Sequence, residues 1–237
     1  MKIMLSHLFA KFGFEIHSFH FGHKVGIEPE YIKLLNFTDS KYSESLIRVG
    51  GHQDGSYLLP REFLNSISAL FSPGIGESIE FDLEIATSGV RVYLADGSVQ
   101  SLPVVIPNNL LRLVNVVYKH VGLLVNKDTI NFNTWILENS SINEKIGIQI
   151  DIEGFEHLIV PNMSREIIDR TYFLIIEFHG FHRLFREDYI GAAHKHTLDF
   201  LNSNFHLIYS RSNKIGGSII IDGREIPQAI EMLWGRK

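Results

Sequence analysis

Residues 69–98, ALFSPGIGESIEFDLEIATSGVRVYLADGS, constrain the fold more than any other stretch of the chain. The apolar run Ala69 to Phe71 is typical of the end of a buried strand, and a turn containing Gly74 and Gly76 interrupts it. Apolar residues then recur through Glu77 to Thr87 with a spacing close to one face of a helix. The pattern predicts a strand, a glycine turn and a helix, in that order.

A second strand and an acidic residue complete this unit. Gly89 is a natural helix stop, and Val90 to Leu94 is an apolar run that leads to Asp96. Asp96 follows the glycine turn by about 20 residues, which is the spacing at which an acid holds the ribose of an adenosine cofactor. The stretch therefore predicts a βαβ unit that binds such a cofactor, and an ordinary strand–helix turn is the alternative.

The glycine turn favours S-adenosylmethionine over NAD. The dinucleotide fingerprint needs a third glycine where the helix packs closely on the strand, and Ile79 stands at that position. Glu77 also places a negative charge where a pyrophosphate would lie. S-adenosylmethionine has no phosphate, and its ammonium and sulfonium groups tolerate a nearby acid.

Composition limits the class of protein. A chain of 237 residues with 45% hydrophobic content can bury a sizeable core, so we expect one domain, residues 46–237, after an extension, residues 1–45. The net charge of −5 argues against a nucleic-acid partner. The chain has no cysteine, no apolar run as long as a transmembrane segment and no typical signal peptide. We therefore expect a cytoplasmic protein, at the inner face of the membrane in one reading, and a homo-oligomer is compatible with the sequence.

The N-terminal part contains two further patterns. Residues 1–12 place apolar side chains on one face of an expected helix, and His17, His20 and His23 follow at intervals of three. We expect the apolar face to pack against the domain or a second subunit, with docking on a membrane surface as the alternative. Metal binding by the histidines is the less favoured interpretation, because no cysteine accompanies them and Gly22 weakens a helix there. Residues 46–60 predict either a β-hairpin around Asp54-Gly55 or a loop over the cofactor, with Asp54 directed at the methionine ammonium.

The rest of the chain predicts a mostly parallel sheet. Strands are expected at 115–118, 146–150, 172–176, 205–209 and 218–221, and helical segments at 134–138, 155–170 and 192–201. Continuous β-branched runs of this kind suit central parallel strands that are covered on both faces. The late strands are separated by short turns, so we expect an antiparallel hairpin at the C-terminal side.

Acidic residues follow three of these strands. Asp96 follows the strand expected at 90–94, and Asp151 and Glu153 follow the strand at 146–150. Glu177 and His179 follow the strand at 172–176. In a parallel sheet they meet at one edge, where ligands bind. Methyl transfer to a hydroxyl also requires removal of a proton. His179 is a natural general base by its ordinary pKa; alternatively, Asp151, Glu177 and His179 hold Mg²⁺ or Mn²⁺, which binds the acceptor hydroxyls.

A basic and aromatic loop, Phe181 to Tyr189, lies next to these acids in the sequence. His182, Arg183 and Arg186 would suit a sugar that carries an acidic group, because arginine pairs with carboxylates and phosphates. An ordinary solvated loop is the alternative.

Several segments resemble the FkbM-type S-adenosylmethionine-dependent methyltransferases. The similarity extends over residues 48–221 and includes DGSYLLP, FSPGIGESIEFD, VYLAD, IQIDIEGFE, LIIEFHG and FHLIYSRSN. It implies a Rossmann-like class I methyltransferase fold, with a seven-stranded sheet, and O-methylation of a sugar or glycan hydroxyl. The chain departs from the family at Asp54-Gly55-Ser56 and at Ser210-Arg211-Ser212-Asn213, where a second glycine, and a histidine with paired asparagines, are common.

The resemblance also implies roles for individual residues. Gly74, Gly76 and Glu77 would line the cofactor loop, Asp96 would bind the ribose, and Asp151 and Glu177 would face the reacting centre. The complete set of expected cofactor contacts is Asp54, Gly55, Ser72, Gly74, Gly76, Glu77, Asp96 and Gly97. We therefore expect an O-methyltransferase, with a nucleotide-dependent oxidoreductase and a catalytically silent binding module as alternatives.

Overall fold

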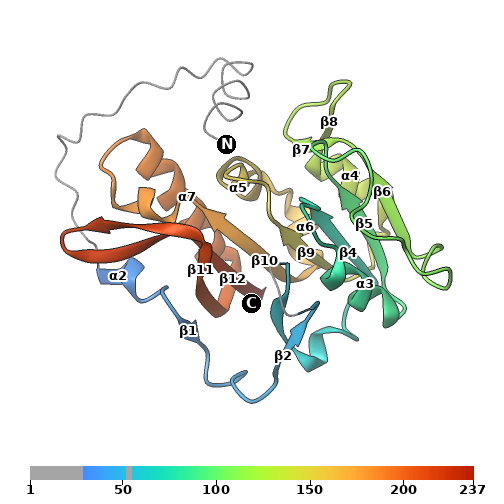
Figure 1. Cartoon of the computed structure of the whole chain (residues 1–237), viewed down its shortest axis with the longest axis horizontal. Coiled ribbons are helices and arrows are strands. Elements are labelled where there is room, and N and C mark those ends of the chain that lie inside the picture. The colour runs from blue at the N-terminus through green and yellow to red at the C-terminus, as the bar shows by residue number, and fades with distance from the viewer. Residues whose placement is uncertain (1–28, 52–54) are drawn as a thin grey trace.

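The computed structural model describes residues 29–51 and 55–237, and its centre is one large sheet (Figure 1). From edge to edge the strands are β1 (Phe37–Thr38), β11 (Phe205–Ile221), β12 (Arg224–Arg236), β10 (Thr171–His179), β9 (Ile146–Ile150), β4 (Ala69–Pro73), β5 (Arg91–Ala95) and β6 (Val114–Val117). The five strands from β10 to β6 run parallel. β12 is antiparallel to both β10 and β11.

This topology confirms the expected Rossmann-like α/β fold with an antiparallel C-terminal hairpin. The sheet has eight strands and not seven, because the two-residue strand β1 pairs with β11 at Ser210 and Tyr209. β1 lies within the predicted N-terminal extension, so part of that extension completes the sheet. The division at residue 46 remains a prediction.

The βαβ unit forms as predicted, with a later helix start. β4 and β5 are parallel neighbours, and α3 (Glu80–Thr87) connects them. The helix was expected from Glu77, but residues 77–79 belong to the turn, and the helix begins only after Ile79, which is fully buried. The turn is therefore three residues longer than the periodicity suggested.

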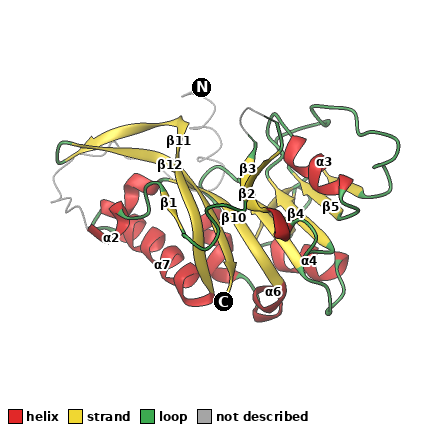
Figure 2. Ribbon diagram, turned by 90° about the horizontal axis from the view of Figure 1, so that it is seen from below, coloured by secondary structure: helices red, strands yellow, loops and turns green. Residues whose placement is uncertain are grey.

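Helices cover one face of the sheet, and a hairpin with one helix covers the other (Figure 2). In Figure 2, α4 (Phe132–Asn139), α6 (Arg165–Arg170) and α7 (Tyr189–Asn204) lie on one side. On the other side are α3 and the hairpin of β2 (Leu46–Val49) and β3 (Tyr57–Pro60), which confirms the hairpin reading of this segment. The remaining elements are α2 (Pro29–Ile32), β7 (His120–Gly122), β8 (Thr129–Asn131), α5 (Glu156–Ile159) and the short 3₁₀ helices η1 (Arg61–Phe63), η2 (Val160–Asn162) and η3 (Phe181–Phe185).

The two faces of the sheet differ in polarity near the carboxyl ends of the strands. Towards α4, α6 and α7 the strands stay apolar throughout, as Ile150 and Phe178 illustrate. Because side chains alternate along a strand, Leu70, Phe173 and Ile175 point to the hairpin face, where they join a second apolar cluster. Further along the same face the residues become polar: Ser72, Gln149, Asp151, Glu177 and His179. This polar end positions the candidate site.

Two late strands are longer than expected. β10 was predicted to end at Ile176, but it continues to His179, because β12 pairs with it up to Ala229. Strand and turn were expected between 205 and 221, whereas β11 is one strand with a register shift between Asn213 and Ser218. The partner strand β12 supplies a continuous set of backbone groups, so the glycines near 216 cause an irregularity and no reversal.

Other expectations hold or fall outside the described residues. The strand at 146–150 is confirmed to the residue, and the helix expected at 192–201 extends over Tyr189–Asn204. The loop expected at 181–189 is instead η3 followed by the start of α7. The predictions for residues 1–12, for His17, His20 and His23, and for Asp54 lie outside the described residues. Every described helix is too short or too polar to cross a lipid bilayer.

Candidate functional site

The glycine turn after β4 is tied to the strand-end acid Asp96. One carboxylate oxygen of Asp96 accepts hydrogen bonds from the backbone N–H groups of Ile75 (2.9 Å) and Gly76 (3.3 Å). The other accepts from the backbone N–H (2.7 Å) and hydroxyl (2.6 Å) of Ser98. The structure therefore brings the predicted turn and the predicted acid together.

These contacts determine the protonation state of Asp96 and how many further hydrogen bonds its carboxylate can accept. Burial alone would raise its pKa, but the hydrogen bonds from Ser98, Gly76 and Ile75 outweigh burial and lower it. Asp96 is therefore ionised at neutral pH. A carboxylate has about four lone-pair sites, and the four protein donors occupy all of them. A ribose would have to replace one, and the hydroxyl of Ser98, an exposed residue, is the easiest to displace.

The glycines in this region are required for different physical reasons. A Cβ on Gly74 would lie 1.6 Å from the carbonyl oxygen of Asp151, and one on Gly97 would lie 2.5 Å from His120, so both positions exclude side chains by close packing. Gly76 has a positive φ of 54°, and no atom lies within 4 Å of its Cβ position. Gly76 therefore borders open space beside Asp96, where a ligand can lie.

Two glycines near the ends of β2 and β3 lie close to this turn and to α3. The Cβ position of Gly55 is 3.2 Å from the Ser78 side chain, and the backbone N–H of Gly50 donates to Glu84 at 2.7 Å. These contacts hold the hairpin against the glycine turn and α3. The hairpin interpretation of residues 46–60 is confirmed, and the loop over the cofactor, with Asp54 at the methionine ammonium, stays a prediction.

The second group of acids gathers around His179. Ligand atoms of Asp151, Glu177 and His179 all lie within 4.8 Å of one another. Nε2 of His179 lies 3.9 Å from Asp151, 3.7 Å from Glu177 and 3.7 Å from Glu153. Asp151 comes from the end of β9, and Glu177 and His179 come from neighbouring β10, where i and i+2 share a face. The predicted convergence of these residues is therefore correct in space, although β10 includes two of them.

Two residues that the sequence analysis did not assign hold this cluster in place. The Glu156 carboxylate contacts Nδ1 of His179 at 3.0 Å and accepts from the backbone N–H groups of Ile152 and Gly154. Asn213 of β11 donates to Glu177 at 2.7 Å. Glu156 lies within the family-like segment IQIDIEGFE, and Asn213 is the last residue of SRSN, so both stood in motifs without an assigned role.

Like charges and burial set the electrostatics of the cluster. Asp151 keeps 31% of its side chain exposed, yet the protein atoms around its carboxyl and the charge of Glu177 raise its pKa well above the ordinary value. Burial lowers the pKa of His179, but Glu156, Asp151 and Glu177 outweigh burial and raise it to about 9. A protonated His179 counts against its use as a neutral base at pH 7, and leaves one cation among several carboxylates.

A buried polar chain runs from β4 through β9 to the hairpin strand β3. The Ser72 hydroxyl donates to the Gln149 side chain, and Gln149 donates to the hydroxyl of Tyr57 at 2.9 Å. Burial, together with the charges of Asp151 and Glu177, raises the pKa of Tyr57 well above its ordinary value. Ser72 is fully buried in this chain, so its predicted contact with a cofactor remains a prediction.

An acid of α3 lies at the other end of this chain. Asp82 is 5% exposed, and burial outweighs its contact with Ser72 and raises its pKa to about 7. Within the described residues, Oδ1 of Asp82 has no hydrogen-bond partner. The sequence pattern did not predict that Asp82 is buried, because the apolar spacing of the helix does not include position 82.

The predicted acceptor residues occupy a short 3₁₀ helix directly after β10. Arg186 lies beyond the end of this helix and pairs with Asp188, which caps α7 by accepting from the N–H groups of Ile190 and Gly191. His182 and Arg183 are half-buried and belong to η3 itself. The segment is therefore an ordered part of the fold beside His179, and not a solvated loop.

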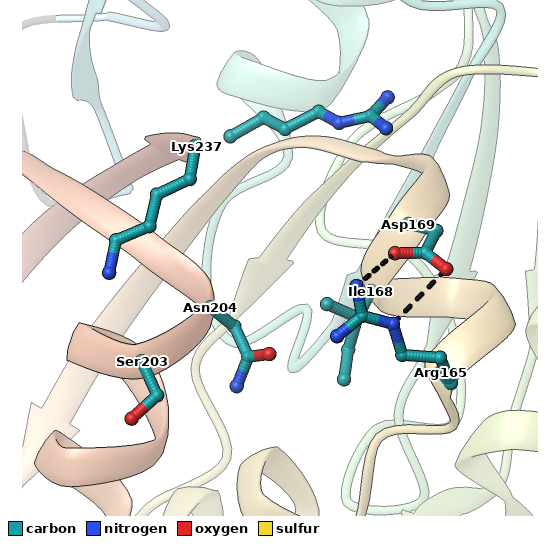
Figure 3. Close-up of a pocket in the computed structure, with 7 residues that line it drawn as sticks. Arg165, Ile168, Asp169, Ser203, Asn204 and Lys237 are labelled. Carbon is teal, nitrogen blue, oxygen red and sulfur yellow. Dashed lines mark hydrogen bonds and ion pairs between the residues drawn. The ribbon is translucent and has the colours of Figure 1, made fainter.

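A shallow depression of about 190 Å³ lies elsewhere on the molecule (Figure 3). Its lining includes Arg165 and Asp169, which pair with each other, together with Asn204 and Lys237. These residues precede β10 and β11 or follow β12, so the depression belongs to the amino-terminal edge of β10. It is remote from the strand-end acids, and we do not assign the site to it.

Comparisons with known proteins complete this description. No family model and no curated protein matches the sequence. Among solved structures, the chain is similar to a proposed O-methyltransferase from Klebsiella pneumoniae, with 8% identity, a TM-score of 0.43 and coverage of 90% of this chain and 93% of that one. The magnesium protoporphyrin IX methyltransferase of Synechocystis, solved with bound S-adenosylmethionine, gives 10% identity, a TM-score of 0.36 and coverage of 75% and 73%.

The bifunctional kinase-methyltransferase WbdD gives 12% identity and a TM-score of 0.41, with coverage of 74% of this chain and 36% of that one. At these identities and scores the function has to be argued from the site itself. Membership of the FkbM family likewise stays a prediction.

Proposed function

We propose that this chain is an S-adenosylmethionine-dependent O-methyltransferase that acts on a hydroxyl of a sugar or glycan. The observation that carries the proposal is the placement of two different acidic groups at the carboxyl edge of one parallel sheet. Asp96 lies beside the glycine turn, and Asp151 and Glu177 lie at the ends of the strands next to it. Ligands of open α/β sheets bind at this edge.

The residues of the turn fit the adenosine part of the cofactor. Asp96 presents an ionised carboxylate, and the open space at Gly76 lies directly beside it. Glu77 is exposed, and Glu80 and Asp82 occupy the first turn of α3. Three acids around the helix start oppose a pyrophosphate and accept a ligand without phosphate. When bound, S-adenosylmethionine supplies the methyl group on its sulfonium.

The second acidic group supports the acceptor chemistry. Forming the new oxygen–methyl bond releases the hydroxyl proton, which needs an acceptor at the reacting centre. Asp151 and Glu177 supply carboxylate oxygens there, Glu156 orients His179, and Asn213 orients Glu177. In the alternative route, Asp151, Glu177 and His179 would hold Mg²⁺ or Mn²⁺, and the charge of the ion would lower the pKa of the acceptor hydroxyl.

The proposal extends to the acceptor side of the site, the cellular location and the domain bounds. We propose that His182 and Arg183 belong to the acceptor side, since η3 follows His179 directly. We place the enzyme in the cytoplasm, at the inner face of the membrane where a surface glycan is assembled, and treat residues 46–237 as the methyltransferase domain. A homo-oligomer would use surfaces away from the carboxyl edge of the sheet.

Calorimetric titration with S-adenosylhomocysteine tests the proposal, with NAD as comparator and with or without Mn²⁺. We expect micromolar binding of S-adenosylhomocysteine and none of NAD. Binding of NAD alone would identify a nucleotide-dependent oxidoreductase. Binding of neither would favour the silent-module alternative, for which the saturated carboxylate of Asp96 is the specific observation. Chelation that abolishes methyl transfer would select the metal route, and full activity without metal would select the carboxylates.

A further inference from the structure

The Arg183 side chain on η3 lacks an anionic partner. It is half-buried, and among residues 29–51 and 55–237 no carboxylate forms a hydrogen bond or ion pair with it. Burial and the nearby charge of Arg186 lower its pKa, which shows that this guanidinium is held in an unfavourable environment. Charged groups withdrawn from water are normally paired. Arg183 is therefore a cation that a ligand can satisfy.

The nearest carboxylates have other functions in the structure. Glu156 contacts His179 and two backbone N–H groups, and only 2% of its side chain is exposed. Asp188 pairs with Arg186 and caps α7. The charges of both acids raise the pKa of Arg183 from a distance, but neither acid forms a hydrogen bond or ion pair with it. Within the described residues, Arg186 therefore has a carboxylate partner and Arg183 has none.

Three imidazoles surround the same place, and each has a buried nitrogen without a hydrogen-bond partner. Within the described residues these atoms are Nδ1 of His157, Nδ1 of His182 and Nε2 of His194. The rings of His157 and His194 are stacked with centroids 5.0 Å apart. The Cβ position of Gly180 lies 2.8 Å from Nε2 of His194 and 3.3 Å from Nε of Arg183, so both atoms lie against the same glycine.

His194 makes the clearest case for a missing partner. Its side chain is 1% exposed, and its Nδ1 contacts the carbonyl oxygen of Ile190 at 2.8 Å, so Nδ1 carries the proton. Nε2 is then a buried lone pair, and leaving it unsatisfied is unfavourable. A buried water molecule can donate to it, whereas a sugar cannot reach an atom that is closed off from solvent. Arg183 and His194 together present one cation and one hydrogen-bond acceptor.

We infer that Arg183, with His182 and His194 beside it, forms a subsite for an anionic group, a carboxylate or a phosphate, on the sugar acceptor. The inference rests on the proposed function and names its substrate class. Arg186, expected from the sequence to share this role, is occupied by Asp188. Arg183 replaces it as the principal anion-binding residue, and its planar guanidinium suits two-point binding of a carboxylate or phosphate.

The subsite lies next to the acidic cluster, where a cation can offset the repulsion between the carboxylates and an anionic acceptor. The backbone N–H of Arg183 donates to the carbonyl oxygen of Gly180 at 2.7 Å, so η3 begins within one turn of His179. Asp151, Glu177, Glu153 and Glu156 repel any anionic acceptor that approaches the reacting centre. A cation on the acceptor side offsets this repulsion and fixes which hydroxyl is presented, so it determines both binding and orientation.

NMR of the histidine rings in the full chain tests this inference without cofactor. The probes are methyl β-D-glucuronide, glucose 6-phosphate and methyl β-D-glucoside, and the ring signals are assigned with His182→Gln and His194→Gln. We expect the two anionic sugars to shift the signals of His182 and His194, and the neutral glucoside to leave them unchanged. The arm with the lower dissociation constant identifies carboxylate or phosphate as the preferred anion.

Variants of two arginines make the test specific. Arg183→Gln should weaken binding of the anionic sugars at least tenfold, whereas Arg112→Gln, which removes the same charge from an exposed position, should not. Arg183→Lys keeps the charge and should lose affinity partly, and it replaces Arg183→Gln if that variant does not fold. Equal shifts with the neutral glucoside, no shift with either anion, or unchanged binding in a folded Arg183 variant would overturn the inference.

The outcome is separable from the proposed function. Binding of S-adenosylhomocysteine without any response to anionic sugars would reject the subsite and leave the methyltransferase proposal intact. A response to anionic sugars without cofactor binding would do the reverse.

Discussion

Asp96 and Asp151 are both aspartates that follow a parallel strand of the same sheet, yet their surroundings give them opposite properties. Asp96 accepts four hydrogen bonds from the glycine turn and Ser98, and its pKa is lowered. Asp151 faces Glu177 and Glu156 across a small space, and its pKa is raised. One carboxylate is stabilised as an anion by hydrogen bonds from Ser98 and the glycine turn, and the other is destabilised by burial and then by like charges.

The difference separates binding from chemistry. A carboxylate with a low pKa and fixed donors is a rigid hydrogen-bond acceptor, which suits recognition of a neutral ribose. A crowded carboxylate with a raised pKa responds to protons and cations, which suits proton removal or metal binding. Asp82 adds a third environment, in which an acid is buried and, within the described residues, one of its carboxyl oxygens has no hydrogen-bond partner. The following variants test this comparison.

Glu177→Gln and Asp151→Asn should have the largest effect. Each change removes a carboxylate from the reacting centre while Asp96 and the glycine turn stay intact, so we expect turnover to fall about 10²–10⁴-fold. Affinity for S-adenosylhomocysteine should stay within a factor of about three. Transfer of a labelled methyl group to an acceptor sugar measures the first quantity, and calorimetry measures the second. Near-normal turnover would reject the catalytic role.

Asp82→Asn should stabilise the protein above neutral pH. The carboxyl has a pKa of about 7 in the folded chain against its ordinary value of 3.8, so the folded state binds the extra proton between these values. Stability therefore falls as pH rises from 3.8 to about 7, and is constant above that range. The variant removes this loss, which is roughly 4 kcal/mol at most at pH 8.

Thermal unfolding of both proteins from pH 4 to pH 8.5 checks this prediction. The melting temperatures should coincide at the acidic end and diverge as the pH rises. A constant difference across the range would mean that Asp82 ionises normally in the folded chain.

Asp96→Ala should weaken binding of S-adenosylhomocysteine about 10–100-fold, because charged hydrogen bonds contribute about 1.5–3 kcal/mol. It should also lower the melting temperature, since Ile75, Gly76 and Ser98 lose their acceptor. Asp96→Asn is the matched control, which keeps one acceptor oxygen and should lose less affinity. A lower melting temperature with unchanged affinity would assign Asp96 to the turn alone.

Ser98→Ala should have the smallest effect. It removes the hydroxyl that occupies one lone pair of Asp96, and the backbone N–H of residue 98 stays in place. We expect affinity for S-adenosylhomocysteine to rise about two- to threefold, because the ribose no longer displaces an internal donor. A tenfold loss measured by calorimetry would show that the serine hydroxyl contacts the ligand itself.

The fold was largely predictable from local patterns. Residues 146–150 are a strand to the residue, because a β-branched run between polar turns has few other structures available. The end of β10 was not predictable, because Glu177 and His179 are polar residues that stay in the strand only through pairing with β12. The start of α3 was also misplaced: Ile79 is buried, as the periodicity predicts, but it lies just before the first helical residue.

The candidate site was predictable in its members and not in its contacts. Acids at strand ends are visible in the sequence, and parallel strands bring their ends together, so the convergence of Asp151, Glu177 and His179 followed from pattern alone. Glu156 and Asn213 were not predicted, because their roles depend on α5 packing near β10 and on Asn213 of β11 reaching Glu177 across β12. Arg183 and Arg186 looked equivalent until the structure gave one of them a partner.

The sequence by itself determined the class of the fold, the order of the βαβ unit and the residue types at the carboxyl edge. These properties depend on periodicity and turn chemistry, which act over a few neighbouring residues. The tertiary structure alone decided which acids are ionised, which histidine nitrogen is oriented and which arginine stays unpaired. Protonation and pairing depend on distances between segments far apart in the chain, and only packing of the sheet and its covering layers sets those distances.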